Sequence, residues 1–75
     1  MNSMADALAA KREAQRRLAD VSGLRGIGIT WDTNGEPNVL VNVDLTEFNE
    51  VRNRLAGSIL GVPVRIETVG PIKAE

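Results

Sequence analysis

The sequence contains neither cysteine nor histidine. Without cysteine the chain can form no disulfide, no thiolate zinc site and no thiol nucleophile, and without histidine it has no imidazole base. Aromatic residues are limited to one tryptophan and one phenylalanine, whereas RNA-reading sheets stack bases on several aromatic rings. These absences remove many of the common catalytic, metal-binding and RNA-binding sites.

Neither sign of charge dominates, because nine basic residues stand against ten acidic residues and leave a net charge of -1. The whole-molecule charge therefore gives no attraction to nucleic acid or to anionic lipid. No apolar run approaches the roughly 18 residues that a membrane span needs. The run over residues 7–10 lies between Asp6 and Lys11, with no basic stretch before it, unlike a signal peptide. We expect a cytoplasmic protein.

The composition that is present is that of a small folded domain, with 75 residues, 43% of them hydrophobic and 25% charged. A chain of this length buries only about 60% of the surface that it exposes when unfolded. We therefore expect a single domain over residues 1–75 with a thin margin of stability.

The first predicted element is a helix over residues 4–22. Ser3 and Asp6 have the spacing of a capping box, and Gly23 is a natural stop because glycine can take the left-handed conformation beyond a helix end. The apolar residues recur at helical spacing, at Met4, Ala7, Leu8, Ala14, Leu18 and Val21.

Three strands and a second helix are predicted to follow. Large and small side chains alternate over residues 25–32, and apolar and polar ones over 38–45, as in strands with one buried face. Asn34 and Gly35 lie between these runs and are typical of a hairpin turn. A helix capped by Thr46 is expected over residues 47–56, and a third strand over 62–68. The connector between them should cover the end of the core with Ile59 and Leu60.

This order predicts an α+β fold, a two-layer α-β-β-α-β sandwich. The connection from the second to the third strand is a helical crossover of about 16 residues, which is long enough to step over one strand. We expect the third strand beside the first. The result is a three-stranded antiparallel sheet of order 2-1-3, with both helices on one face.

The opposite face of this sheet is the candidate interaction face, because no further segment remains to cover it. Antiparallel sheets often leave one face in water, and glycines in a strand can also mark the close approach of a partner. Trp31 and Phe48 fall on the buried side, so the open face has no ring for stacking a base. We expect it to carry Gly26, Gly28, Thr30, Leu40, Asn42, Arg65 and Glu67, with Asp44 at the end of the second strand.

Two glycine and carboxylate patterns are better explained by structure than by chemistry. Gly26 and Gly28 lie inside a predicted strand and not between a strand and a helix N-terminus, where a phosphate loop would need them. The stretch over residues 32–36 resembles the start of a calcium loop, but the twelfth residue counted from Asp32 is Val43 and not a glutamate. We predict no metal and no cofactor.

Nucleic-acid binding is the alternative function. The first helix carries Lys11, Arg12, Arg16 and Arg17, but these do not form one stripe, and Glu13–Arg17 and Arg16–Asp20 are spaced to pair at i,i+4. The α-β-β-α-β order partly resembles KH domains. The Gly-x-x-Gly clamp of that family is missing, because Gly57 to Gly61 has one residue too many.

Four short stretches carry a resemblance to a known module, and they lie within Leu24 to Ile72: residues 24–29, 34–37, 61–68 and 70–72. They resemble a small bacterial α/β module that occurs alone in uncharacterised proteins. It also looks like the segment ahead of the peptidase domain in some trypsin-like serine proteases. The resemblance implies no catalytic residue in this chain.

The sequence therefore predicts a non-enzymatic protein-interaction module. Its partner is another protein or a second copy of the chain, as in a homodimer, bound through the open sheet face or a strand edge, and it binds no membrane. An enzyme would need a buried cleft lined by Asp44, Glu47 or Arg65, for which a two-layer core of this size leaves little volume.

Overall fold

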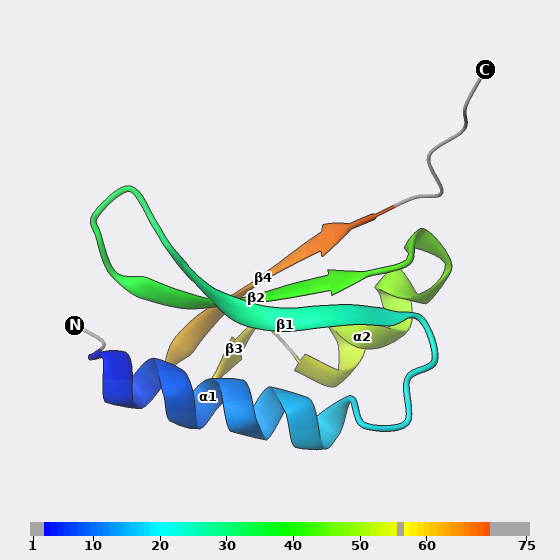
Figure 1. Cartoon of the computed structure of the whole chain (residues 1–75), viewed down its shortest axis with the longest axis horizontal. Coiled ribbons are helices and arrows are strands. Elements are labelled where there is room, and N and C mark those ends of the chain that lie inside the picture. Colours follow the sequence, from blue (N-terminus) through cyan, green and yellow to red (C-terminus); the bar gives the residue numbers. More distant parts are fainter. Residues whose placement is uncertain (1–2, 56, 70–75) are drawn as a thin grey trace.

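Two α-helices and four strands make up the described part of the chain, residues 3–55 and 57–69, in a computed structural model (Figure 1). Residue 56, the predicted last residue of the second helix, and residues 70–72, which carry the end of the resemblance, lie outside the described residues. In chain order the elements are α1 (Met4–Arg17), β1 (Leu24–Trp31), β2 (Pro37–Val43), the 3-10 helix η1 (Leu45–Glu47), α2 (Phe48–Leu55), β3 (Ser58–Ile59) and β4 (Val62–Thr68).

Helix α1 begins with the predicted capping box. The Asp6 N–H donates to the Ser3 hydroxyl and the Ser3 N–H donates to the Asp6 carboxylate, both at 3.1 Å. The helix ends earlier than predicted, at Arg17, with Leu18 as its C-cap. The predicted stripe is wrong at its first turns, because Met4 and Leu8 are 42% and 41% exposed. Alanines face the sheet instead, so the helix lies close to it.

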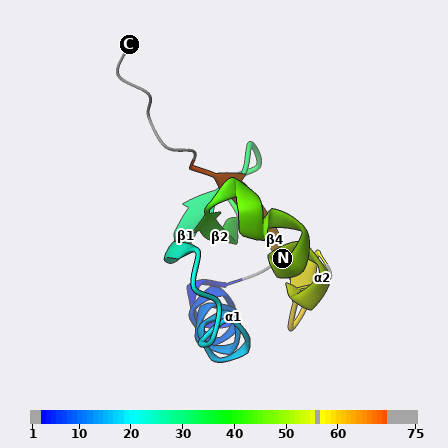
Figure 2. The same cartoon turned by 90° about the vertical axis from the view of Figure 1, so that its right-hand side faces the viewer.

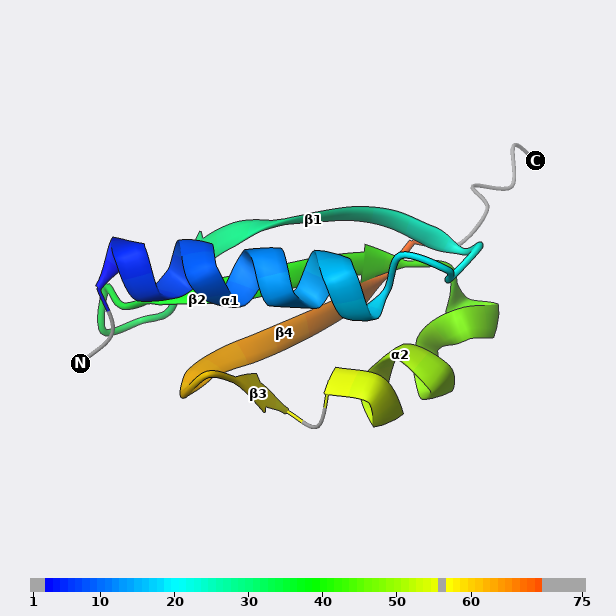
Figure 3. The same ribbon diagram turned by 90° about the horizontal axis from the view of Figure 1, so that it is seen from below.

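The strand order corrects the predicted topology. The sheet is four-stranded and mixed, with the order β1-β2-β4-β3, and not a three-stranded antiparallel sheet of order 2-1-3. Strand β4 lies beside β2 and runs parallel to it. The crossover through α2 thus returns the chain next to the strand it left, which is the usual βαβ arrangement. The α+β class and the placement of both helices on one face are confirmed (Figures 2 and 3).

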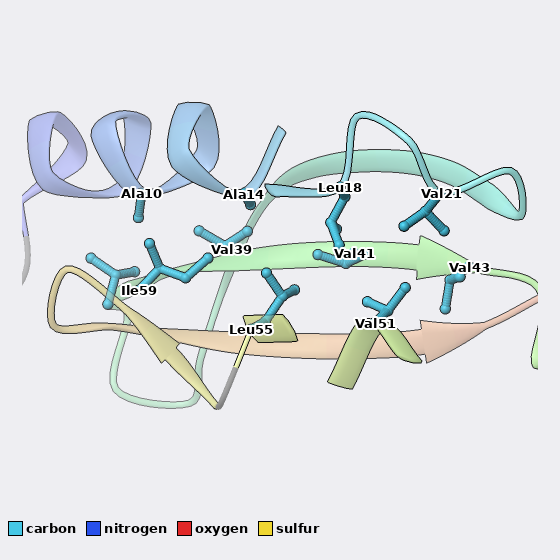
Figure 4. Packing of buried hydrophobic residues seen from close by; sticks show 11 residues of the cluster. Ala10, Ala14, Leu18, Val21, Val39, Val41, Val43, Val51, Leu55 and Ile59 are labelled. Carbon is cyan, nitrogen blue, oxygen red and sulfur yellow. The ribbon is translucent and has the colours of Figure 1, made fainter. Parts of the chain in front are cut away.

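The core lies between the helices and β2. Val39, Val41 and Val43 of β2 are fully buried, and Figure 4 shows Ala14 of α1 and its C-cap Leu18 over Val39 and Val41. Helix α2 and the β3–β4 hairpin complete the core with Val51, Leu55, Ile59 and Val62. The alternation predicted for the second strand is therefore confirmed. The complete burial of every second side chain agrees with the interior position of β2, between β1 and β4.

The predicted hairpin between β1 and β2 is confirmed, and Asp32 organises its turn. The Asp32 N–H donates to the Glu36 carbonyl at 3.0 Å, and its carbonyl accepts from the Gly35 N–H at 2.9 Å. Its carboxylate accepts from the Asn34 N–H at 2.9 Å and from the Glu36 N–H at 3.0 Å. Trp31, expected in the core, is 55% exposed because it ends β1 at this turn.

Gly23 does not have the role predicted for it. It follows the end of α1 by several residues, and its φ is not in the left-handed region. Gly23 is buried, and a Cβ added there would lie 2.2 Å from the Cγ of Glu47. Its carbonyl accepts from the Asp44 N–H at 2.9 Å. Glycine is needed here for a close approach of two chain segments.

The start of the second helical segment also differs from the prediction. Thr46 lies inside η1, so it does not cap α2, and Asp44 precedes η1 without a side-chain cap. Helix α2 ends at Leu55, and Gly57, with a φ of +85°, begins the turn toward β3. The expected connector after it contains the short strand β3, whose Ile59 is 1% exposed.

The turn between β3 and β4 places Leu60 in the left-handed region. Leu60 has a φ of 53° and Gly61 a φ of 81°, the pair of positive values that a two-residue type I′ turn requires. Leu60 was expected to cover the core but is 66% exposed. A leucine in this conformation costs roughly 1–2 kcal/mol because its Cβ crowds the following carbonyl.

Replacing Leu60 by asparagine is therefore expected to stabilise the chain. Asparagine tolerates the left-handed region, and no buried contact is lost, so the free energy of unfolding should rise by roughly 0.5–1 kcal/mol. Urea denaturation followed by circular dichroism measures this change. Leu60→Ala is the matched control and should change stability little, since alanine keeps the Cβ. A loss of stability in Leu60→Asn would contradict the strain assigned to this turn.

Candidate functional site

The residues of the predicted interaction face do lie together on the face of the sheet turned away from α1 and α2, called the outer face below (Figure 2). Directly opposite residues of neighbouring strands share a face. Gly28, Leu40 and Arg65 form one row across β1, β2 and β4. A second row, Gly26, Asn42 and Glu67, runs beside it, and Thr30 lies opposite Asn38.

No described helix covers this face, and the space above the two glycines of β1, called the glycine floor below, is empty of described atoms. A Cβ added at Gly26 or Gly28 would meet no atom within 4 Å. Neither glycine has a positive φ. The described residues therefore give no steric or conformational reason for glycine at these two positions, in contrast to Gly23.

The charges at the margins of the outer face are paired. Arg65 and Glu67 form an ion pair at 3.0 Å, with 60% and 46% of their side chains exposed. Arg25 donates twice to the Asp44 carboxylate, at 2.7 and 3.2 Å, and this raises the pKa of Arg25 above its ordinary value. Exposed pairs of this kind contribute little stability, but they leave the face without an excess of either charge.

Asp44 lies just beyond the end of β2, at the margin of the outer face, where its carboxylate pairs with Arg25. Strand β2 ends at Val43, two residues earlier than predicted, and the Asp44 N–H donates to the Gly23 carbonyl at 2.9 Å. Glu47 packs beside Gly23, and Arg65 pairs with Glu67 on β4. The three side chains named for a catalytic cleft therefore do not converge. Among residues 3–55 and 57–69, no cluster of acidic side chains could hold a metal ion.

The basic side chains are largely occupied by carboxylates. Five of the eight basic residues that the structure describes form ion pairs: Arg16, Arg17, Arg25, Arg54 and Arg65. The predicted pair Glu13–Arg17 is confirmed at 2.8 Å, and Glu50 pairs with Arg54 at 2.6 Å. No single-sign stripe of the kind that binds nucleic acid results from this arrangement.

One predicted pair, Arg16 with Asp20, is wrong. Because α1 ends at Arg17, Asp20 lies in the following turn and not on the same helix face. Its carboxylate accepts from Arg54 at 2.6 Å, which lowers the pKa of Asp20. Arg54 also donates to the Arg17 carbonyl at 3.1 Å and so ties α2 to the end of α1.

The carboxylate of Glu13 is expected to make stability depend on pH. Hydrogen bonds from Arg16 and Arg17 lower its pKa from 4.5 to about 2. A lowered folded-state pKa gives stability that is complete above about pH 4.5 and is lost as the pH falls through about 2. Melting temperatures measured between pH 6 and pH 1.5 should therefore be lower for Glu13→Gln than for the unmodified chain in the upper part of this pH range. The two melting temperatures should become equal in its lowest part. Asp20 titrates in both proteins, so their difference isolates Glu13, and a constant difference would contradict the assignment.

Two features of the sheet escaped the sequence reasoning. One is the free edge of β1, which could not be found while β1 was expected between two strands. The other is the exposure of Trp31, which the alternation places on the helix side. The only sequence signal for the exposure of Trp31 was its position as the last residue before the turn.

Comparison of the chain with protein-family models, with curated proteins and with solved structures finds no match. The resemblance to the small bacterial module stays a prediction from the sequence. None of the described helices is long and apolar enough to cross a membrane.

Proposed function

We propose that this chain is a non-enzymatic protein-interaction module that binds its partner through the outer face. One observation carries the proposal: two glycines in an open strand have no role within the chain. Glycine in a strand is roughly 0.5–1 kcal/mol less stable than alanine, and both Gly26 and Gly28 have room for a Cβ. A partner whose backbone approaches this floor closely would account for both.

The chemistry of the face favours a flat partner of low charge. Leu40 is half-buried and lies opposite Gly28 of β1 on one side and Arg65 of β4 on the other. Because Arg65 is already paired with Glu67, the face offers shape and a small apolar centre and no electrostatic attraction. Such a surface suits an uncharged strand or sheet better than a polyanion.

Gly28→Ala separates an effect on the stability of the chain from an effect on partner binding through the outer face. We expect the free energy of unfolding to rise by roughly 0.5–1 kcal/mol, because alanine loses less entropy on folding and its Cβ meets no atom. We expect binding through the outer face to weaken at the same time. If Gly28→Ala is stabilised and captures partners as well as the unmodified chain, the close approach is contradicted.

Capture of proteins from cells tests whether the partner binds to the outer face. Leu40→Glu places a charge in the centre of the outer face, whereas Leu45→Glu places the same charge on η1, where Leu45 is 66% exposed. Proteins captured from cells by the unmodified chain and by Leu45→Glu, but not by Leu40→Glu, are the expected result. Equal capture by all three proteins would rule out the outer face.

A further inference from the structure

The two edges of the sheet differ in how they are protected. Natural edge strands carry charges, prolines or bulges, or lie under another segment, because their free N–H and C=O groups otherwise pair with other chains. Beyond β4 lies the short strand β3, and the rest of that edge carries Arg65 and Glu67. Strand β1 is the other edge. From Gly26 to Trp31 it has no charge and no proline, and no described element lies beyond it (Figure 2).

The hydrogen bonds of the hairpin determine which groups of β1 face this edge. The Asp32 N–H donates to Glu36, so this pair is hydrogen-bonded. Along an antiparallel ladder, hydrogen-bonded and non-bonded pairs alternate. Trp31 opposite Pro37 is therefore a non-bonded pair, as it must be since proline has no N–H. Ile29 and Ile27, two and four residues earlier, also form non-bonded pairs with their partners on β2.

A contact on the far side of β2 supports this assignment. The Val43 carbonyl accepts from the Val69 N–H at 2.9 Å, so the odd-numbered residues of β2 direct their backbone groups to β4. Their partners on β1 are the odd-numbered residues of that strand. Ile27, Ile29 and Trp31 consequently direct their N–H and C=O groups to the free edge.

These three residues are spaced symmetrically about Ile29. We propose that β1 pairs antiparallel with β1 of a second copy of this chain, with Ile29 opposite Ile29 of that copy. In this register Ile27 lies opposite Trp31 of the second copy and Trp31 opposite its Ile27. Every free group of the three residues then has a partner, and the two sheets become one continuous sheet.

The side chains of β1 also favour a second copy of this chain as the partner. Ile27, Ile29 and Trp31 share the helix side of the sheet, where the isoleucines are half-buried and Trp31 is 55% exposed. Pairing places each indole ring beside an isoleucine of the second copy, which removes apolar surface from water. A net charge of -1 gives two copies little repulsion. A peptide of unrelated sequence would satisfy the backbone, but only a second copy also brings the isoleucine and tryptophan side chains that match those of β1.

The contact between the two copies is small, so we expect it to be weak. Stable interfaces bury roughly 800 Å² on each partner, and the five paired residues from Ile27 to Trp31 span only about 17 Å. We expect a weak dimer with a dissociation constant on the order of 100 µM. This inference goes beyond the proposed function, because it uses the edge of the sheet and not the outer face, and commits to a second copy.

Mass and cross-linking test the dimer and its register. Sedimentation equilibrium of the full chain should show a mass near 8.1 kDa in dilute solution that rises toward twice this value at millimolar concentration. The chain has no cysteine, so single cysteines report distances cleanly. Ile29→Cys should oxidise to a covalent dimer, since paired Cα atoms lie about 5.5 Å apart. Ile27→Cys is the matched control, with its two copies roughly 14 Å apart along the strand.

Two further variants separate this inference from the proposed function. Ile29→Pro removes an N–H that faces the edge and should abolish the dimer, with circular dichroism to verify the fold; if it unfolds, the cysteine pair decides. Leu40→Glu should leave the dimer intact. A monomer at millimolar concentration, or equal cross-linking of Ile29→Cys and Ile27→Cys, would overturn the inference. Loss of the dimer in Leu40→Glu but not in Ile29→Pro would also overturn it, while supporting the outer face as the binding surface.

Discussion

Leu18→Ala is expected to lower the free energy of unfolding by about 2–5 kcal/mol. Leu18 is fully buried and lies over Val41 at the point where α1 ends (Figure 4). Removing three carbons there loses transfer free energy and leaves a cavity that α1 cannot easily fill, because its neighbouring core residues are alanines. A domain of this size has a total stability of roughly 4–11 kcal/mol, so the variant should be close to unfolding at body temperature.

Urea denaturation followed by circular dichroism measures this loss as a lower midpoint. Leu45→Ala is the matched control, because Leu45 is 66% exposed and makes no part of the core. It should change stability by less than about 0.5 kcal/mol. If the two substitutions had similar effects, the contact of α1 with β2 would not be the main source of stability.

Gly23→Ala has the second-largest expected effect, a loss of roughly 1–3 kcal/mol from overpacking. The new Cβ would lie 2.2 Å from Cγ, 3.2 Å from Cβ of Glu47 and 3.3 Å from Cβ of Asp44. Relief requires a rotation of Glu47 and a shift of the backbone, because two of these atoms are held by η1 and by the residue before it. The shift would also strain the hydrogen bond from the Asp44 N–H to the Gly23 carbonyl.

A double substitution tests the cause of this loss. Glu47→Ala removes the Cγ that the new Cβ would strike, so Gly23→Ala should cost much less in that background. The expected coupling between the two substitutions is roughly 0.5–2 kcal/mol, measured by a double-mutant cycle in urea. Equal costs in both backgrounds would show that some other feature of Gly23 matters. Gly28→Ala, with the opposite expected sign, verifies that glycine replacement in this chain is not harmful in general.

The comparison of Gly23 with Gly28 shows what local sequence patterns cannot reveal. Both are glycines beside apolar residues, and both were assigned from their position along the chain. Their actual roles differ because residues 44–47, far away in sequence, pack on one and no described residue packs on the other. The candidate face could be predicted from the sequence because alternation depends only on neighbouring residues, whereas the end of β2 at Val43 could not, because the chain there turns to pack residues 44–47 beside Gly23.

The sequence by itself determined the elements that depend on local spacing: the capping box at Ser3, the hairpin at Gly35, and the division of β2 into a buried and an open side. Only the tertiary structure decided the strand order, the early end of α1 and the free edge of β1. The physical reason is that side-chain alternation is the same for a central and an edge strand. The neighbour of a strand is chosen by how α2 packs on return, and this choice joins residues that are distant in the chain.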